Sequence, residues 1–382
     1  MKISQVEALH LRLPEVKEVA DGTQDVLIVR VHTDTGLTGL GEVVSCSYVA
    51  RAVVEAPRSA PFRHGLAEIV RGMDPLDTES ALEAMIDGTA WYGPGGIARH
   101  SISGIDMALW DIKGKAAGKP VRQLLSESAV EQLPCYASVL WPNDPGQVAE
   151  SARRFLAQGY RAVKYGWAPM GPDPALDAAL VEAARDALGP EVELMVDAGR
   201  VWDVETALSR AELFAPYNIA WLEEPLKPFD FAGYAQLAAQ SPVPIAAGEA
   251  MALLEDYERL IEPGGIHIAQ PDLGRIGGIT QGRRLCASQQ RAPGAACLWH
   301  RRIAGRFRAM GRRLRSAPHR IHARPLAPGA KPSPPRHAIQ RRPTAPKRRT
   351  GARCRTRRGR SRAIPDRLIY GPAARSNPPL PP

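Results

Sequence analysis

Between residues 131 and 290, short apolar runs alternate with longer stretches whose apolar side chains recur at helical spacing. Short apolar runs bounded by turn-forming residues predict buried strands, and apolar positions three and four residues apart predict amphipathic helices. The expected strands span 135–140, 161–167, 193–199, 219–225, 243–249 and 265–272, and the expected helices lie near 147–157, 174–188, 203–214, 230–240, 252–262 and 278–289. Six strand and helix units in succession are typical of a parallel β/α barrel.

Three carboxylates lie at the ends of three successive apolar runs. Asp197, Glu223 and Glu249 are each separated from the next by 26 residues. The carboxyl ends of parallel barrel strands converge on one face, so equal spacing is expected to bring these side chains together. Anionic oxygens gathered in this way need a hard cation, and the pattern therefore predicts a Mg²⁺ site. The alternative is that each acid caps the following helix or pairs with a basic side chain.

Residues 1–130 have a different pattern and predict a separate α+β domain. The segment DVLIVRVHT (25–33) alternates apolar and polar positions and predicts a strand. The segment GLTGLGE (36–42) predicts a glycine-rich hairpin turn, since it lacks the strand-to-helix context of a dinucleotide-binding loop. Residues 100–125 predict a helix that places most of its apolar side chains on one face. The barrel domain is expected to follow over 131–290.

The segment 291–382, the Arg/Pro-rich tail, carries the positive charge of the chain. It contains 25 of the 50 Lys and Arg residues, one of the 40 acids, Asp366, and 15 of the 35 prolines. The net charge of +10 therefore belongs to the tail and does not indicate a nucleic-acid groove in the folded part. No specific nucleic-acid partner is expected, and the composition of the tail predicts disorder.

The tail begins where a closed barrel would need its seventh and eighth units. The barrel is therefore expected to be incomplete at its C-terminal end. One explanation is a shifted reading frame in a GC-rich gene, because Arg, Pro, Ala and Gly are read from GC-rich codons. The alternative is a genuine basic extension.

Cysteine usage and hydropathy set the expected compartment. The five cysteines are scattered and lack metal-ligand spacing, which is typical of reduced thiols. The chain has no apolar run of about 18 residues that could span a membrane, and residues 1–14 lack the pattern of a signal peptide. A cytoplasmic enzyme with no membrane partner is the expectation.

Several motifs over residues 1–284 resemble the mandelate racemase and muconate lactonizing enzyme family of the enolase superfamily. The helical signature is SISGIDMALWDIKGKAAGKPVRQLL (101–125), with Ser101 where Ala is usual. MVDAG, WLEEP and AAGE resemble the three metal-ligand strands, and QPDLGRIGG (270–278) is similar to the segment that bears a catalytic Asp. The resemblance implies a TIM-type (β/α)7β barrel with an N-terminal α+β capping domain.

The resemblance also implies roles for individual residues. Asp197, Glu223 and Glu249 would bind Mg²⁺, and Glu224 would point away from the metal because neighbouring strand residues alternate faces. Lys164 would stabilise the substrate carboxylate. Asp272 would hydrogen-bond a histidine base on the next strand and raise its basicity, unless it is a surface Asp at a helix start.

This chain departs from the family pattern at three places. The histidine base is expected near residue 299, but 299 is Trp, and His300 lies in a segment without strand alternation and is read as accidental. Gly166 replaces the second lysine of a Lys-X-Lys pair, and Gly199 replaces a more usual Asn near the metal. Racemisation needs proton donors on both faces of the substrate, so the loss at Gly166 favours dehydration.

The leading hypothesis is a Mg²⁺-dependent lyase that removes the proton next to a carboxylate and eliminates water from a sugar acid. The first alternative is a racemase, epimerase or cycloisomerase of the same family. The second is an inactive, damaged family member with an incidental basic tail. A small-molecule carboxylate is the expected partner, and the frequent symmetric oligomers of the family add a homo-oligomer to the expectations.

Overall fold

The computed structural model describes residues 1–14, 25–126, 132–261 and 265–291. The Arg/Pro-rich tail, apart from Arg291, lies outside the described residues, as do Trp299 and His300. The α/β class is confirmed, with a parallel sheet flanked by helices after an N-terminal α+β domain. The expected boundary of that domain near residue 130 stays a prediction. None of the helices in the described ranges is long and apolar enough to cross a lipid bilayer.

The N-terminal domain packs a helical layer on a three-stranded antiparallel sheet of order β1-β2-β3. Leu27, Val29 and Val31 alternate along one face of β2 and are fully buried against Ile105 and Leu109 of α4. This alternation confirms the strand expected over 25–33. The elements are β1 (Ile3–Arg12), β2 (Asp25–Thr33), β3 (Thr38–Val43), α1 (Ser47–Glu55), α2 (Leu66–Val70), α3 (Thr78–Thr89), α4 (Ile97–Ala117) and α5 (Val121–Leu125).

Two glycines expected to lie in a turn are instead part of strand β3. Only the first residues of the segment 36–42 form the turn, in which Gly36 has a φ of 85°. At Gly39 and Gly41 an added Cβ would lie 2.0 and 1.9 Å from carbonyl oxygens of α4. The glycines are therefore required for the close approach of α4 to the sheet, which the sequence pattern alone did not reveal.

The helix expected over 100–125 is two helices, α4 and α5. Gly118 ends α4 in the left-handed conformation with a φ of 62°. Pro120 follows and cannot continue the hydrogen-bond ladder of a helix, so α5 starts anew at Val121.

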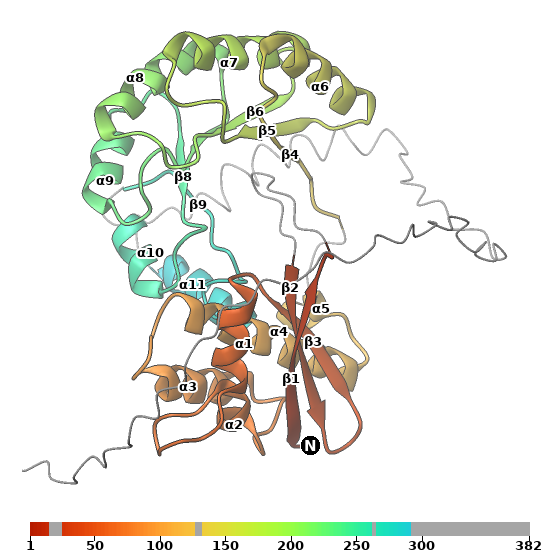
Figure 1. Cartoon of the computed structure of the whole chain (residues 1–382). Helices are drawn as coiled ribbons and strands as arrows, with labels where there is room; N and C mark the ends of the chain where they lie inside the picture. Colours follow the sequence, from red (N-terminus) through yellow and green to blue (C-terminus); the bar gives the residue numbers. More distant parts are fainter. Residues whose placement is uncertain (15–24, 127–131, 262–264, 292–382) are drawn as a thin grey trace, which may run out of the picture. The chain divides into compact units, whose positions relative to one another are not determined.

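The barrel region is a six-stranded parallel sheet of order β4-β5-β6-β7-β8-β9. Figure 1 shows helices α6 to α9 following one another along one side of these strands. All six expected units are present, although β7 and β9 are shorter than their apolar runs. The strands are β4 (Ala137–Leu140), β5 (Ala162–Gly166), β6 (Glu193–Asp197), β7 (Leu222–Glu223), β8 (Ile245–Ala247) and β9 (Ile268–Ala269), and the helices are α6 (Pro145–Ala157), α7 (Pro174–Leu188), α8 (Val204–Phe214), α9 (Phe231–Gln240), α10 (Leu254–Ile261) and α11 (Gly278–Arg291).

The two faces of the sheet carry different cores. One face packs against the helices in a large cluster that includes Val163, Leu194 and Leu222. The other face carries a separate small cluster made of Ala162, Met195, Trp221, Ala246 and Ile268. Because side chains two residues apart along a strand share a face, the second face continues toward the strand ends with polar residues.

The helices that follow Asp197 and Glu223 are capped by other aspartates. The side chains of Asp203 and Asp230 accept hydrogen bonds from backbone N–H groups in the first turns of α8 and α9. These are the helices that follow Asp197 and Glu223. Asp197 and Glu223 are therefore not the caps of those helices.

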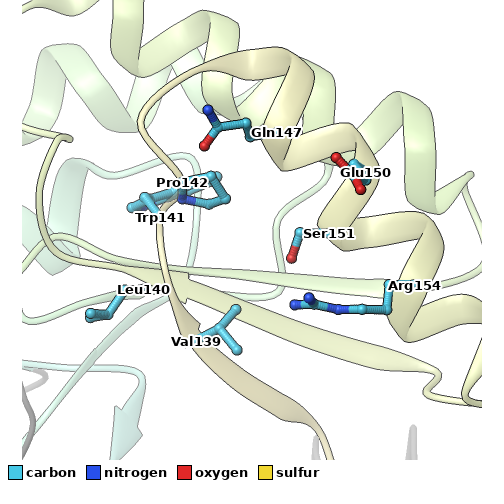
Figure 2. Close-up of a pocket in the computed structure, with 8 residues that line it drawn as sticks. All are labelled: Val139, Leu140, Trp141, Pro142, Gln147, Glu150, Ser151 and Arg154. Atoms are coloured by element: carbon cyan, nitrogen blue, oxygen red, sulfur yellow. The ribbon is translucent and has the colours of Figure 1, made fainter.

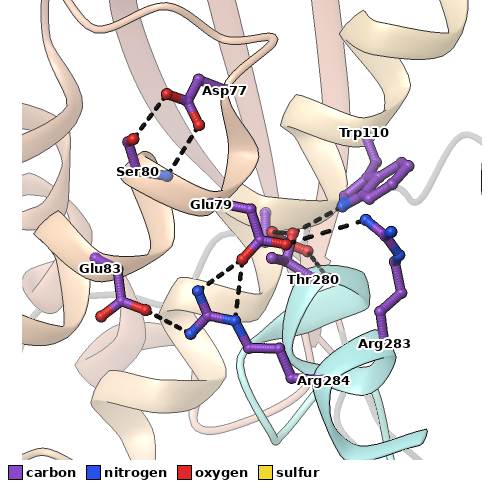
Figure 3. Close-up of polar contacts among 9 residues, drawn as sticks. Asp77, Glu79, Ser80, Glu83, Trp110, Thr280, Arg283 and Arg284 are labelled. Carbon is purple, nitrogen blue, oxygen red and sulfur yellow. Dashed lines mark hydrogen bonds and ion pairs between the residues drawn. The ribbon is translucent and has the colours of Figure 1, made fainter. Parts of the chain in front are cut away.

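Helix α11 is joined to the N-terminal domain through buried and exposed polar contacts (Figure 3). The fully buried Asp106 of α4 accepts hydrogen bonds from the backbone N–H and the hydroxyl of Thr280, and Trp110 Nε1 donates to the same hydroxyl at 2.9 Å. Arg284 pairs with Glu79 and Glu83 of α3 on the surface. The buried contacts dominate, since exposed ion pairs contribute about 0 to 1 kcal/mol.

Candidate active site

Lys164, Asp197 and Glu223, which we call the strand-end cluster, lie near the carboxyl ends of three adjacent strands. Each stands two residues after a member of the small core on the second face, namely Ala162, Met195 and Trp221. The three side chains therefore project from that face. Lys164, Asp197 and Glu223 are 9%, 7% and 0% exposed. The sequence order of the strands thus brings distant polar residues together in a buried place.

The Glu223 carboxylate accepts hydrogen bonds from three side chains. Its Oε1 accepts a short hydrogen bond from Lys164 Nζ, and its Oε2 accepts from Trp221 Nε1 at 2.9 Å and from Gln270 Nε2 at 2.8 Å. Burial pulls the pKa of Lys164 down, but the neighbouring Glu223 carboxylate raises it on balance. Lys164 is thus a protonated cation held against a carboxylate.

Asp197 lies beside this pair and carries an elevated pKa. Its Oδ2 is 3.8 Å from Lys164 Nζ and accepts a hydrogen bond from Trp167 Nε1 at 3.2 Å, and its Oδ1 accepts from the backbone N–H of Gly199 at 2.9 Å. Burial, followed by the charge of Glu223, raises the pKa of Asp197 to about 6. The single lysine therefore does not balance both buried carboxylates.

Glu224 turns to a different partner. Its side chain is 4% exposed and its Oε2 lies 3.4 Å from Arg200 Nε. Burial, then the charge of Glu249, raises its pKa to about 7. The described contacts of Glu224 thus run to Arg200, whereas those of Glu223 run to Lys164, Trp221 and Gln270.

Glu249 lies in the turn that follows β8 and is partly buried. Its charge contributes to the raised pKa values of Asp197 and Glu224, which places it within electrostatic reach of both. No three His, Cys, Asp or Glu side chains in the described part of the chain stand in an arrangement that could hold a metal ion. The side chains as they stand bring Asp197 and Glu223 to Lys164, with Glu249 nearby.

Asp272 lies after β9, in the turn before α11. Its Oδ1 accepts a hydrogen bond from the backbone N–H of Gly274 at 2.7 Å, and its Oδ2 is 3.4 Å from Arg275 Nε. The position near residue 299, where the family resemblance expects the histidine partner of Asp272, is Trp in this chain and lies outside the described residues. A role for Asp272 in orienting a base therefore stays a prediction.

Backbone strain gathers at the same strand ends. Among the described non-glycine residues, Trp167, Arg200, Asn218 and Glu224 have positive φ. Trp167 and Glu224 directly follow β5 and β7, and Arg200 lies shortly after β6. Such conformations cost about 1 to 3 kcal/mol each and tend to cluster at functional sites.

Sequence reasoning missed three residues that contact the carboxylates: Trp167, Trp221 and Gln270. Two of them could have been found from strand alternation. Trp221 stands two residues before Glu223, and Gln270 stands two residues after Ile268 on the same face. Trp167 lies beyond the end of β5, where alternation no longer applies, so no periodic signal pointed to it.

A pocket of about 430 Å³ lies elsewhere, beside the edge strand β4 and helix α6. Figure 2 shows its lining, which includes Trp141, Gln147, Ser151 and Arg154. None of its lining residues belongs to the strand-end cluster. The pocket is therefore distinct from the strand-end cluster.

Two family descriptions match the chain. Residues 9–126 match the N-terminal domain of the mandelate racemase and muconate lactonizing enzymes. Residues 147–303 match the family described as enolase C-terminal domain-like. The chain belongs to the mandelate racemase and muconate lactonizing enzyme family. This membership confirms the resemblance seen in the motifs and makes the chain a hydro-lyase or isomerase of the enolase superfamily.

Several family members are similar to this chain in sequence or in structure. The 3,6-anhydro-alpha-L-galactonate cycloisomerase of Streptomyces coelicolor is 32% identical over 75% of this chain and 79% of its own length. The L-talarate/galactarate dehydratase of Salmonella typhimurium is 33% identical over 73% of this chain and 67% of its own length. A racemase from Streptomyces coelicolor A3(2), solved with bound magnesium, matches with a TM-score of 0.67 and 30% identity over 75% of this chain and 80% of its own.

The residues of this family member fit a divalent cation by charge and by donor type. Asp197, Glu223 and Glu224 are buried, and among the described residues they form ion pairs with Lys164 and Arg200. Gln270 adds a buried amide oxygen without a hydrogen-bond partner among those residues. Carboxylate and amide oxygens are donors for hard cations such as Mg²⁺.

Proposed function

We propose that this chain is a Mg²⁺-dependent dehydratase of a sugar acid, with Asp197, Glu223 and Glu249 as the metal-binding residues. The observation that carries the proposal is the strand-end cluster, where two buried carboxylates share one lysine and the pKa of Asp197 is raised. A bound Mg²⁺ would supply Lewis acidity that makes the C–H bond beside a carboxylate easier to break.

Lys164 has the role of a fixed positive charge in this proposal. Its ammonium is buried and held by Glu223, so it needs no reorganisation when negative charge develops on a substrate carboxylate. Asp272 would orient the base that removes the proton.

Gly166 supports dehydration over racemisation. It faces Asp197 in the register of β5 and β6, and an added Cβ would lie 2.8 Å from Asp197 Cβ. A lysine base at this position would therefore collide with Asp197. Racemisation would need a proton donor on each face of the substrate, and glycine at position 166 supplies none on its side. Elimination of the β-hydroxyl needs only one base and one acid, so it remains possible.

The direct test is incubation of the purified full chain with Mg²⁺ and a panel of sugar acids in D₂O, followed by mass spectrometry. Dehydration predicts an α-keto acid that has lost one water relative to its substrate and has gained one solvent deuterium at the former β carbon when the enol becomes the ketone. The Asp197→Asn variant should give no product. An Asp203→Asn variant, which changes a helix cap outside the cluster, should retain turnover.

A cycloisomerase is the second candidate, favoured by the 32% identity to the Streptomyces enzyme. It predicts a product that has lost no water, has the elemental composition of the substrate apart from deuterium taken from the solvent, and has an altered chromatographic retention. Racemisation predicts uptake of one deuterium at the α carbon without loss of water. If the full chain yields none of these products and binds Mg²⁺ nowhere, the inactive family member is the correct interpretation.

A further inference from the structure

Trp167 is the residue outside the proposed metal-binding set that contacts Asp197 most extensively. Its indole Nε1 donates to Asp197 Oδ2 at 3.2 Å. Its backbone N–H donates to the carbonyl oxygen of Asp197 at 3.0 Å. One residue therefore restrains both the side chain and the backbone of Asp197.

The backbone of Trp167 is strained in a way that makes these contacts possible. Its φ is 69°, in the left-handed region that bulky residues rarely adopt. A strained residue persists only where its surroundings fix it, and here the two hydrogen bonds to Asp197 do so. The conformation turns the chain sharply after β5 and leaves the indole N–H against the carboxylate.

The neighbouring glycines leave room for this arrangement. An added Cβ on Gly199, whose φ is 65°, would lie 3.5 Å from Trp167 Cα, Cγ and Cδ1. A side chain longer than that of alanine would therefore enter the space of the indole. Gly166, on the other side, has no room for a Cβ beside Asp197. Two of the three places at which this chain departs from the family pattern, Gly166 and Gly199, thus border Trp167 and Asp197.

We propose that Trp167 is a positioning residue that orients the Asp197 carboxylate for cation binding. Gly166 and Gly199 leave the space that the Trp167 and Asp197 side chains need for this contact. The inference rests on the proposed function, because it takes Asp197 to be a metal-binding residue. Hydrogen bonds to a ligating carboxylate fix its orientation, and their removal typically weakens metal affinity by about 10- to 100-fold.

The test is isothermal titration of Mg²⁺ into the full chain and into the variants Trp167→Phe and Trp167→His at a pH where imidazole is neutral. Phenylalanine removes the N–H donor, whereas histidine keeps a ring N–H. The expected loss of Mg²⁺ affinity is about 10- to 100-fold for Trp167→Phe and at least about threefold smaller for Trp167→His. The matched control is Trp91→Phe, which changes an exposed tryptophan and should leave the affinity unchanged.

Equal Mg²⁺ affinity in Trp167→Phe and the unaltered chain would overturn the inference while leaving the proposed function intact. Equal losses in Trp167→Phe and Trp167→His would also overturn it, because ring size rather than N–H donation would then be responsible. An unaltered chain that binds no Mg²⁺ would overturn both proposals. Thermal unfolding in EDTA, expected to be similar for all variants, separates these outcomes from loss of folding.

Discussion

The strand-end cluster concentrates more negative than positive charge in a buried place. Lys164 contacts Glu223 and lies 3.8 Å from Asp197 Oδ2, and the side chains of Lys164, Asp197 and Glu223 are only 11%, 10% and 1% exposed. Removing one partner of a buried ion pair leaves an uncompensated charge, which is far more damaging than losing an exposed pair. The stability of this region therefore depends on Lys164 when no other cation is present.

Replacing Lys164 by Met should expose this dependence. In EDTA the free energy of unfolding is expected to fall by about 3 to 5 kcal/mol, because Glu223 and Asp197 lose their shared cation. Added Mg²⁺ should then stabilise Lys164→Met more than it stabilises the unaltered chain. Urea unfolding with and without Mg²⁺ measures both effects, and an unchanged midpoint in EDTA would contradict the account.

Gly166 is the second residue whose identity is dictated by contact with Asp197. In Gly166→Ala the new Cβ would lie 2.8 Å from Asp197 Cβ, so the strands must shift. Overpacking of this kind costs about 1 to 3 kcal/mol. The matched control is Gly95→Ala, whose Cβ would lie 3.6 Å from the Leu253 side chain, in ordinary contact. Equal unfolding midpoints for the two variants would show that β5 and β6 adapt freely.

At the scale of elements, the sequence predicted the barrel units well because the buried face of each strand or helix determines the spacing of its apolar residues. The helix expected over 174–188 matches α7 at both ends. The failures lie where long-range packing decides. Gly39 and Gly41 read as a turn, but they are strand residues whose missing side chains admit α4, and nothing local to the segment reports that contact. Trp167 was missed for the same reason.

Asp106 of α4 holds the first turn of helix α11 by accepting hydrogen bonds from Thr280. Burial raises the pKa of Asp106 to about 6, although hydrogen bonds from Thr280 oppose the rise. The folded state therefore binds a proton more tightly than the unfolded chain, whose Asp pKa is near 3.8. Stability gained from this group is present below about pH 4 and is lost as the pH rises to about 6, by about 3 kcal/mol in total.

The Asp106→Asn variant separates the contribution of Asp106 to the unfolding free energy from that of other acids that titrate between pH 4 and 6. Asparagine cannot ionise, so its unfolding free energy should fall less steeply between pH 4 and 6 than that of the unaltered chain. Urea unfolding across this range measures the difference. Parallel pH profiles for the two proteins would rule out an ionising Asp106 at the junction of α4 and α11.

At the scale of the whole molecule, charge and composition change abruptly after α11. Residues 1–290 carry the motifs of an enolase-superfamily enzyme, whereas the tail holds one acid, Asp366, among 25 Lys and Arg. The family resemblance leads us to expect further barrel units in this region, and the amino-acid sequence cannot say whether a shifted frame has replaced them by the tail. That information lies in the gene and not in the amino-acid pattern.

The coding DNA around codons 280–300 therefore gives a prediction of its own. Translated in the other two frames, it is expected to encode an apolar strand-like run that contains His and is followed by a glycine-containing loop. Such a run would supply the base that Asp272 is proposed to orient. Its absence from both frames would make the tail a genuine basic extension and the chemistry of this chain different from that of its relatives.

The central claim is that Asp197, Glu223 and Glu249 together bind Mg²⁺, and calorimetric titration of Mg²⁺ into single variants tests it most directly. Asp197→Asn, Glu223→Gln and Glu249→Gln should each abolish or greatly weaken binding. Asp203→Asn, which alters only the cap of α8, should bind like the unaltered chain. Undiminished Mg²⁺ affinity in any of the variants Asp197→Asn, Glu223→Gln and Glu249→Gln would contradict the account.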